Sequence, residues 1–88
     1  MIISKNVTIT DAATLIHKAA TNGCKIYIYS ADTGGDVTIG PATVVAGTGY
    51  VIPSSKKTEV TITIPPGDEL YGIMASSSKT LHVTVVEF

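Results

Sequence analysis

The sequence predicts an all-β protein, a small antiparallel β-sandwich or jelly-roll-like fold with about six to eight short strands. Residue classes alternate at every step in segments such as Lys25-Ile26-Tyr27-Ile28-Tyr29, a pattern typical of half-buried strands. Of the 88 residues, 33 are Val, Ile or Thr, whose β-branched side chains pack well on a pleated sheet. Gly, Pro and Ser separate these segments, so tight turns rather than long helices are expected to join them.

Taken in chain order, the alternation predicts strands at residues 2–9, 14–18, 25–30, 37–39, 50–52, 58–64, 69–74 and 80–86. Three segments are predicted to be turns: residues 32–36, which contain two glycines, Pro65-Pro66-Gly67-Asp68, and Ser76-Ser77-Ser78. The two prolines cannot donate backbone hydrogen bonds to a neighbouring strand, so they end the strand before them. Because every second side chain of a strand shares a face, one set of residues is expected to point inward: Ile26, Ile28, Val60, Ile62, Ile64, Leu81, Val83 and Val85. Tyr27 and Tyr29 then lie together on the opposite face.

Residues 11–23 are compatible with two structures. Asp11 could cap a helix that Asn22-Gly23 ends, with an apolar stripe of Leu15, Ile16, Ala19 and Ala20. The alternative is a short strand at residues 14–18 followed by a polar turn. The β pattern on both sides favours the strand.

Length and composition predict one domain, residues 1–88, that associates with other subunits. Charged residues make up 15% of the chain, compared with about 25% in an average soluble domain, and the mean hydropathy is +0.36. A single cysteine, Cys24, excludes an internal disulfide. A small apolar domain without that support is expected to bury part of its surface against other subunits, so we predict a homo-oligomer.

Charge and hydropathy argue against two classes of partner. The net charge is −1, the lysines are scattered along the sequence, and arginine is absent. Binding to the phosphates of a nucleic acid needs clustered cations, and recognition of its bases favours Arg. No apolar run reaches the ~18 residues of a membrane span, and Met1-Ile2-Ile3 meets Lys5 too soon for a signal peptide. We expect no nucleic-acid or membrane partner and synthesis in the cytoplasm without secretion.

Residues that could carry chemistry are few, and we predict that the protein is not an enzyme and has no cofactor. His17, His82 and Cys24 lack the close paired spacing of a zinc site, so no metal site is expected. Cys24 and His17 could form a nucleophile pair only through the fold, with no third group suggested to orient the base. A calcium loop at residues 32–36 is disfavoured because the span is too short for the twelve-residue ligand arrangement.

Tyrosines offer the remaining binding chemistry. The four tyrosines, Tyr27, Tyr29, Tyr50 and Tyr71, could stack on sugar rings, although packing on a sheet or at a subunit interface is the commoner use of Tyr. The predicted interaction surface consists of Ile2, Ile3, Tyr27, Tyr29 and Tyr50. Residues 1–6 could act as an N-terminal arm, with Ile2 and Ile3 adding as a strand to a neighbouring sheet edge.

From Lys25 onward, an order of short motifs resembles a known group of proteins. Lys25-Ile26-Tyr27-Ile28-Tyr29 is followed by Gly34-Gly35-Asp36-Val37-Thr38-Ile39-Gly40, then by Val60-Thr61-Ile62-Thr63-Ile64 and Gly67-Asp68-Glu69-Leu70-Tyr71-Gly72, and the chain ends on an L-x-V-x-V strand at Leu81. This order is similar to the small β-sandwich modules of tailed-bacteriophage virions, which decorate capsids or form fibre and tail heads, commonly as homotrimers. The resemblance covers residues 7–88 and carries no catalytic residues.

The resemblance implies a virion structural protein. The leading expectation is a capsid decoration (cement) protein that binds the head surface as a homo-oligomer, with the major capsid protein or another virion protein as its partner. The alternative is a fibre, tail or adhesion module that binds host-surface glycan through Tyr27, Tyr29 or Tyr50.

Overall fold

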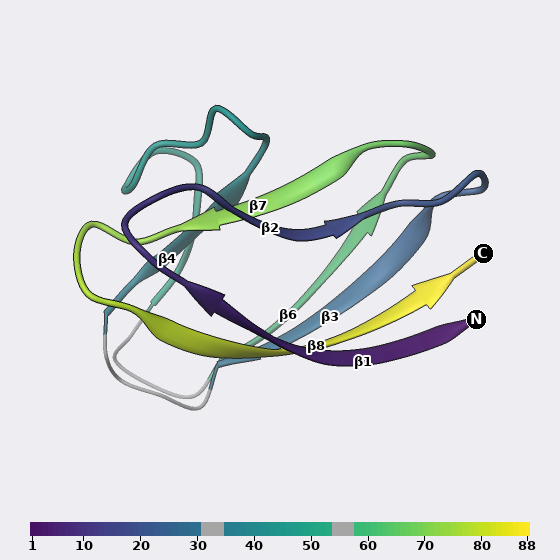
Figure 1. Cartoon of the computed structure of the whole chain (residues 1–88), viewed down its shortest axis with the longest axis horizontal. Helices are drawn as coiled ribbons and strands as arrows, with labels where there is room; N and C mark the ends of the chain where they lie inside the picture. Colours follow the sequence, from purple (N-terminus) through teal and green to yellow (C-terminus); the bar gives the residue numbers. More distant parts are fainter. Residues whose placement is uncertain (31–34, 54–57) are drawn as a thin grey trace.

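The computed structural model of the chain describes residues 1–30, 35–53 and 58–88, and over these residues it is an all-β sandwich (Figure 1). The predicted fold class is confirmed: within the described residues, eight strands form two four-stranded sheets, and every strand pair is antiparallel. Sheet A contains, in spatial order, β1 (Ile2–Ile9), β8 (Lys79–Glu87), β3 (Cys24–Ser30) and β6 (Thr58–Ile64). Sheet B contains β2 (Thr14–Lys18), β7 (Glu69–Ile73), β4 (Val37–Gly40) and β5 (Tyr50–Ile52).

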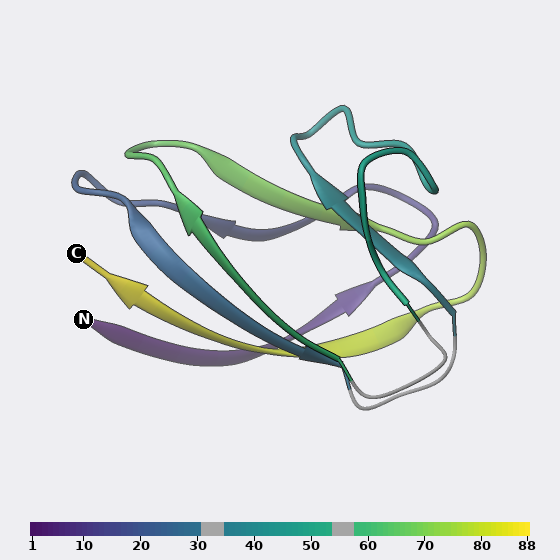
Figure 2. The ribbon, with the colours of Figure 1, turned by 180° about the vertical axis from the view of Figure 1, so that it is seen from behind.

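The strands follow the predicted segments closely. Differences are confined to the ends, with β3 beginning one residue earlier, at Cys24, and β8 extending to both Lys79 and Glu87. The predicted hairpin at residues 32–36 lies mostly outside the described residues. The view from behind in Figure 2 shows the long strands of sheet A crossing the molecule from the ends of the chain to the opposite side.

Residues 11–23 form the strand and turn, so the helical alternative is wrong. The backbone groups here bond to other parts of the chain: β2 pairs with β7, and the Ala19 N–H donates to the Asp68 carbonyl at 2.8 Å. The turn before β3 depends on Gly23, which has φ +81° and packs so closely that an added Cβ would lie 2.8 Å from the Ile64 carbonyl oxygen. A helix at residues 11–23 would leave these hydrogen bonds to β7 and to Asp68 unmade.

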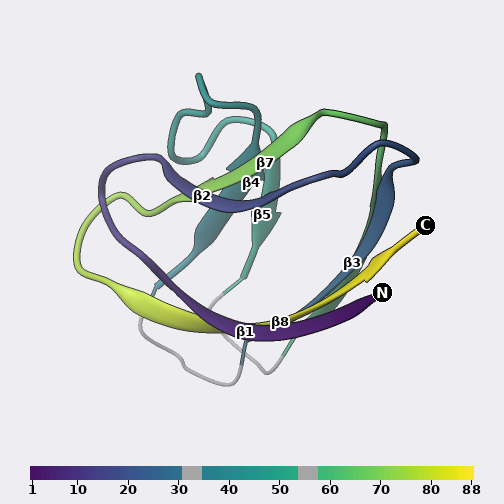
Figure 3. The same cartoon turned by 45° about the vertical axis from the view of Figure 1, so that its right-hand side comes forward.

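The two sheets face each other (Figure 3), and the buried apolar side chains of both form the core. Seven of the eight side chains predicted to face inward are buried, and Ile62 is half-buried and packs against the core. Sheet B contributes Ile16, Val37, Ile39, Ile52 and Leu70 from the other side. Burial of each such aliphatic side chain contributes about 1.5–3 kcal/mol, which makes this layer the main source of stability.

Residues 1–6 are not a free arm, which corrects that prediction. Ile2 and Ile3 pair with Val86 and Val85 at the start of a continuous β1–β8 ladder. Met1 extends the contact, since its amino group donates to the Glu87 carbonyl at 3.1 Å and its carbonyl accepts from the Glu87 N–H at 2.7 Å. The two ends of the chain therefore lie side by side (Figures 1 and 2), and Ile2 and Ile3 already have a strand partner.

Candidate functional site

The five residues of the predicted interaction surface are not gathered into one site. Ile2 and Ile3 lie on β1 beside the chain ends, Tyr27 and Tyr29 lie on the outer face of β3, and Tyr50 begins β5 in the other sheet. Ile2, Tyr27 and Tyr50 are exposed, whereas Ile3 and Tyr29 are half-buried. The alternation thus assigned Tyr27 and Tyr29 correctly to a shared face, but the fold places Tyr50 apart from them.

The outer face of sheet A carries a shallow hollow of about 360 Å³ in which Tyr27 and Tyr29 take part. Its other walls include Asn6 from β1 and Glu59 and Thr61 from β6. The Lys25 ammonium lies 5.6 Å from the centre of the Tyr27 ring, and the Tyr29 ring packs at 6.2 Å from that of His82. Both tyrosine rings therefore already have neighbours on the sheet.

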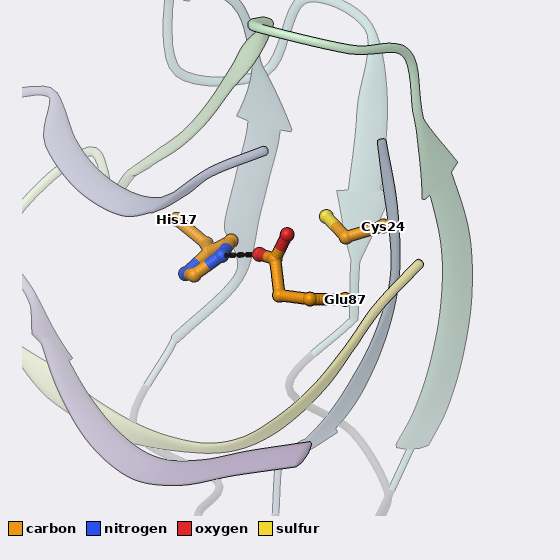
Figure 4. Close-up of side chains that lie close together, drawn as sticks. All are labelled: His17, Cys24 and Glu87. Atoms are coloured by element: carbon orange, nitrogen blue, oxygen red, sulfur yellow. Dashed lines mark hydrogen bonds and ion pairs between the residues drawn. The ribbon is translucent and has the colours of Figure 1, made fainter. Parts of the chain in front are cut away.

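A second group of polar side chains lies inside the sandwich, near the chain ends. We call it the inner polar cluster: Lys5 of β1, His17 of β2, Cys24 of β3 and Glu87 of β8. Figure 4 shows the Glu87 carboxylate between the His17 ring and the Cys24 sulfur, which points toward it. Ligand atoms of His17, Cys24 and Glu87 all lie within 4.8 Å of one another. Four strands from both sheets therefore meet at this point.

A β-bulge in β2 brings His17 into the cluster. Leu15 pairs with Tyr71, but the next paired residue is His17, opposite Leu70, so Ile16 is the extra residue. Directly opposed residues share a face of the sheet, and Leu70 is buried. Without the bulge, simple alternation would place Ile16 inward and His17 outward, whereas the extra residue lets both face the interior.

Glu87 is the best-connected member of the cluster. One carboxylate oxygen contacts His17 Nε2, and the other accepts from the Ala20 N–H at 3.0 Å. The hydrogen bond from His17 lowers the pKa of Glu87, against the opposing effect of desolvation. Glu87 is therefore held as a carboxylate anion that links β8 to β2 and to the turn that follows β2.

Lys5 connects β1 to the cluster through His17 of β2. Its Nζ donates to His17 Nδ1 at 3.0 Å, so the proton of the neutral imidazole lies on Nε2, facing Glu87. Partial burial lowers the pKa of Lys5, and the negative charge of the nearby Glu87 carboxylate opposes this effect. In β1, Lys5 shares its inward face with the apolar residues Ile3, Val7 and Ile9, so its polar partner, His17, is supplied only by the fold.

Cys24 is fully buried and stays protonated. Burial raises the pKa of its thiol, and the Glu87 carboxylate raises it further. A catalytic cysteine instead needs a cationic environment that lowers the thiol pKa. The fold thus brings Cys24 and His17 near each other, but with an anion beside the sulfur that disfavours a nucleophilic thiolate in the metal-free protein.

Sequence reasoning identified His17 and Cys24 as candidates but not Glu87. The inward position of Glu87 was readable, since it continues the buried series Leu81, Val83, Val85. The inward position of His17 was not, because the bulge reverses its face. His82, the other histidine, lies on the exposed face and contacts the Asn6 side-chain oxygen at 3.0 Å.

Comparison of the chain with protein-family models, with curated proteins and with solved structures finds no match. Among the described residues, no helix is long and apolar enough to cross a membrane.

Proposed function

We propose that this chain is a bacteriophage capsid decoration protein that self-associates and binds the head surface, strengthening the shell across the joints between capsid subunits. The order of motifs from Lys25 to the final strand supports the assignment to a virion module. The low charge content of the chain supports self-association.

The observation that carries the self-association is the free edge of β6. Over the described residues β6 pairs only with β3, and the register between them is continuous from Cys24–Ile64 to Ser30–Thr58. Its seven residues, TEVTITI, contain one charge and neither lysine nor proline. A long, regular edge strand of this composition presents unpaired backbone groups that can pair with another chain.

The other three edge strands carry features that oppose such pairing. β1 directs the charged Lys5 inward, β2 is broken by its bulge, and β5 has only three residues. Inward charges, bulges and short edges are the usual means by which sheets avoid joining edge to edge. Since β6 lacks all three, we assign the subunit contact to β6.

Exposed apolar side chains extend this argument to the ends of the molecule. Met1, Ile2 and Phe88 lie beside the two termini, and Val45 and Tyr50 lie in or next to the connection between β4 and β5. These two groups are at opposite ends of the sandwich (Figure 1). Each offers apolar area that a neighbouring subunit or the capsid could cover.

The oligomer is tested by light scattering at two protein concentrations. We expect a mass of three chains, about 27 kDa from a protomer of 9.1 kDa, since the virion modules that the chain resembles are commonly trimers and threefold rings suit capsid joints. The double variant Thr61→Lys/Thr63→Lys places two charges on the exposed face of β6 and should reduce the mass to that of one chain. Thr8→Lys, an exposed position on β1, is the matched control. A monomeric unmodified chain would refute the self-association.

Capsid binding is tested by co-sedimentation with emptied heads of the source phage and by the melting temperature of those heads. A protein that binds only the assembled shell stabilises it by RT ln(1 + [L]/Kd), about 2.7 kcal/mol per site at a hundredfold excess over Kd. The shells should therefore melt at a higher temperature when the protein is bound. Absence of co-sedimentation together with an unchanged melting temperature would refute the decoration role.

The hollow beside Tyr27 and Tyr29 favours a second candidate function, a fibre or adhesion module that binds glycan. Aromatic faces next to polar groups such as Asn6 and Glu59 suit sugar rings and their hydroxyls. The ring contacts of both tyrosines limit the open aromatic surface, which places this candidate second. A glycan array with the unmodified chain and with Tyr27→Ala separates the two functions, because decoration predicts no glycan signal in either.

A further inference from the structure

We propose that His17, Cys24 and Glu87 form a site for one zinc ion, with a fourth coordination position open to water. The ligand side chains lie inside the sandwich rather than on the outer surfaces assigned to subunit and capsid contacts, and zinc binding is measured without capsids, so the site can be tested independently of the proposed function. The inference reverses the expectation drawn from residue spacing, because the fold supplies the proximity that the sequence separation lacks.

The donor set suits zinc chemically. Zinc accepts thiolate sulfur, imidazole nitrogen and carboxylate oxygen, and sites with three protein ligands keep a fourth position for water. A tetrahedral ion with bond lengths of about 2.0–2.3 Å needs its ligand atoms roughly 3.3–3.8 Å apart. The ligand atoms here all lie within 4.8 Å of one another, close to that range, so binding requires side-chain rotations that open the contact between His17 Nε2 and the Glu87 carboxylate to admit the ion.

The three ligands project from three different strands rather than from a loop. Cys24 begins β3, Glu87 ends β8, and His17 is fixed by the bulge of β2. Cys24 is fully buried, and the side chains of His17 and Glu87 are only 11% and 9% exposed. The backbone of all three ligands is held by strand pairing, so the adjustments needed for binding are confined to side chains.

The charges balance when the ion enters. The Glu87 carboxylate already carries one negative charge, and Cys24 releases its thiol proton to solvent as the zinc–sulfur bond forms. The two anionic ligands then neutralise Zn²⁺, leaving the Lys5 cation at the margin. The same carboxylate that disfavours a bare thiolate at Cys24 becomes a partner once a cation lies between them.

Lys5 sets the geometric cost of binding. When Nε2 of His17 binds zinc, its proton must move to Nδ1, where it meets the Lys5 Nζ now 3.0 Å away. Both groups are then donors, so Lys5 must turn aside. Metal-bound histidines normally donate this second N–H to an acceptor. Lys5→Gln supplies such an acceptor and should tighten zinc binding, an effect that a purely structural His17–Glu87 contact would not produce.

Zinc binding is measured by titration calorimetry on the full chain, reduced and freed of metal with a chelator. We expect one Zn²⁺ per chain. Cys24→Ser and His17→Gln should each weaken binding by at least about tenfold, and Lys5→Gln should strengthen it severalfold. His82→Gln, which changes the histidine on the outer face, is the matched control and should bind as the unmodified chain does.

Cobalt substitution provides a second readout that needs no variant, in case a substitution in the cluster prevents folding. Co²⁺ bound by Cys24 gives a thiolate-to-cobalt charge-transfer band in the near ultraviolet and intense visible bands if the site is tetrahedral. These bands, reversed by added Zn²⁺, would support the site. No binding heat, or binding that is unchanged in Cys24→Ser, or cobalt spectra without the thiolate band, would each overturn it.

Discussion

Gly72 permits the close approach of β7 to two core isoleucines, and Gly72→Ala should destabilise the fold through them. A Cβ at this position would lie 3.0 Å from Ile9 Cδ1 and 3.3 Å from Ile16 Cδ1, whereas carbon atoms pack best at about 3.5–4.0 Å. Ile9 and Ile16 are 0% and 1% exposed, so neither side chain can move into solvent. The backbone at Gly72 has no positive φ, so the effect comes from packing.

The magnitude follows from two opposing effects. Overpacking a filled core costs about 1–3 kcal/mol, while replacing glycine by alanine restricts the unfolded chain and returns about 0.4–1 kcal/mol. We therefore expect Gly72→Ala to lower the free energy of unfolding by about 0.5–2 kcal/mol. The measurement is urea unfolding followed by circular dichroism, with midpoint and slope both fitted.

A double variant tests the packing explanation itself. Ile9→Val removes the Cδ1 atom nearest to the added methyl group and alone should cost about 0.5–1.5 kcal/mol. Because the added methyl group would occupy the vacated space, Gly72→Ala/Ile9→Val should lose less stability than the sum of the two single variants. Strictly additive losses, or a Gly72→Ala chain more stable than the unmodified one, would refute the reasoning.

Three further outcomes are expected from the structure. First, the metal-free protein should lose stability in acid, because the pKa of Glu87 is lowered in the folded chain. The Glu87 carboxylate contributes its full stabilisation above the ordinary glutamate pKa of 4.5. This contribution is lost as the pH falls through the lower pKa that Glu87 has in the folded state. Glu87→Gln should show a flatter profile of unfolding free energy against pH, and an equal slope in both chains would contradict this. Second, Cys24 should react with iodoacetamide far more slowly in the native protein than in urea, since the thiol is buried and its pKa is raised; equal rates would show that the thiol is accessible. Third, Lys79→Ala should cost about 1–3 kcal/mol in urea unfolding, because the buried Lys79 Nζ donates to the Gly35 carbonyl at 2.7 Å, whereas the exposed Lys18→Ala should change stability by less than about 0.5 kcal/mol.

Strand positions were predictable because they depend on local pattern. The alternation around Ile26 and Ile62 specifies which side chains must be buried, and that requirement holds for any strand partner. The same local signal predicted that Tyr27 and Tyr29 share a face. Residues 11–23 were compatible with two structures, because their apolar residues fit the period of a helix as well as that of a strand. Only the pairing of β2 with β7 decides between the two.

Fold class, strand segments and the inward faces of the regular strands could be read from the amino-acid order, since they follow from side-chain periodicity and from turn residues within a few positions of each other. The inner polar cluster could not, because it exists only in the folded chain. His17 and Glu87 are 70 residues apart, and the face of His17 is set by a bulge that forms when β2 pairs with β7. A register irregularity is a property of two strands together, so no pattern in one strand could reveal it.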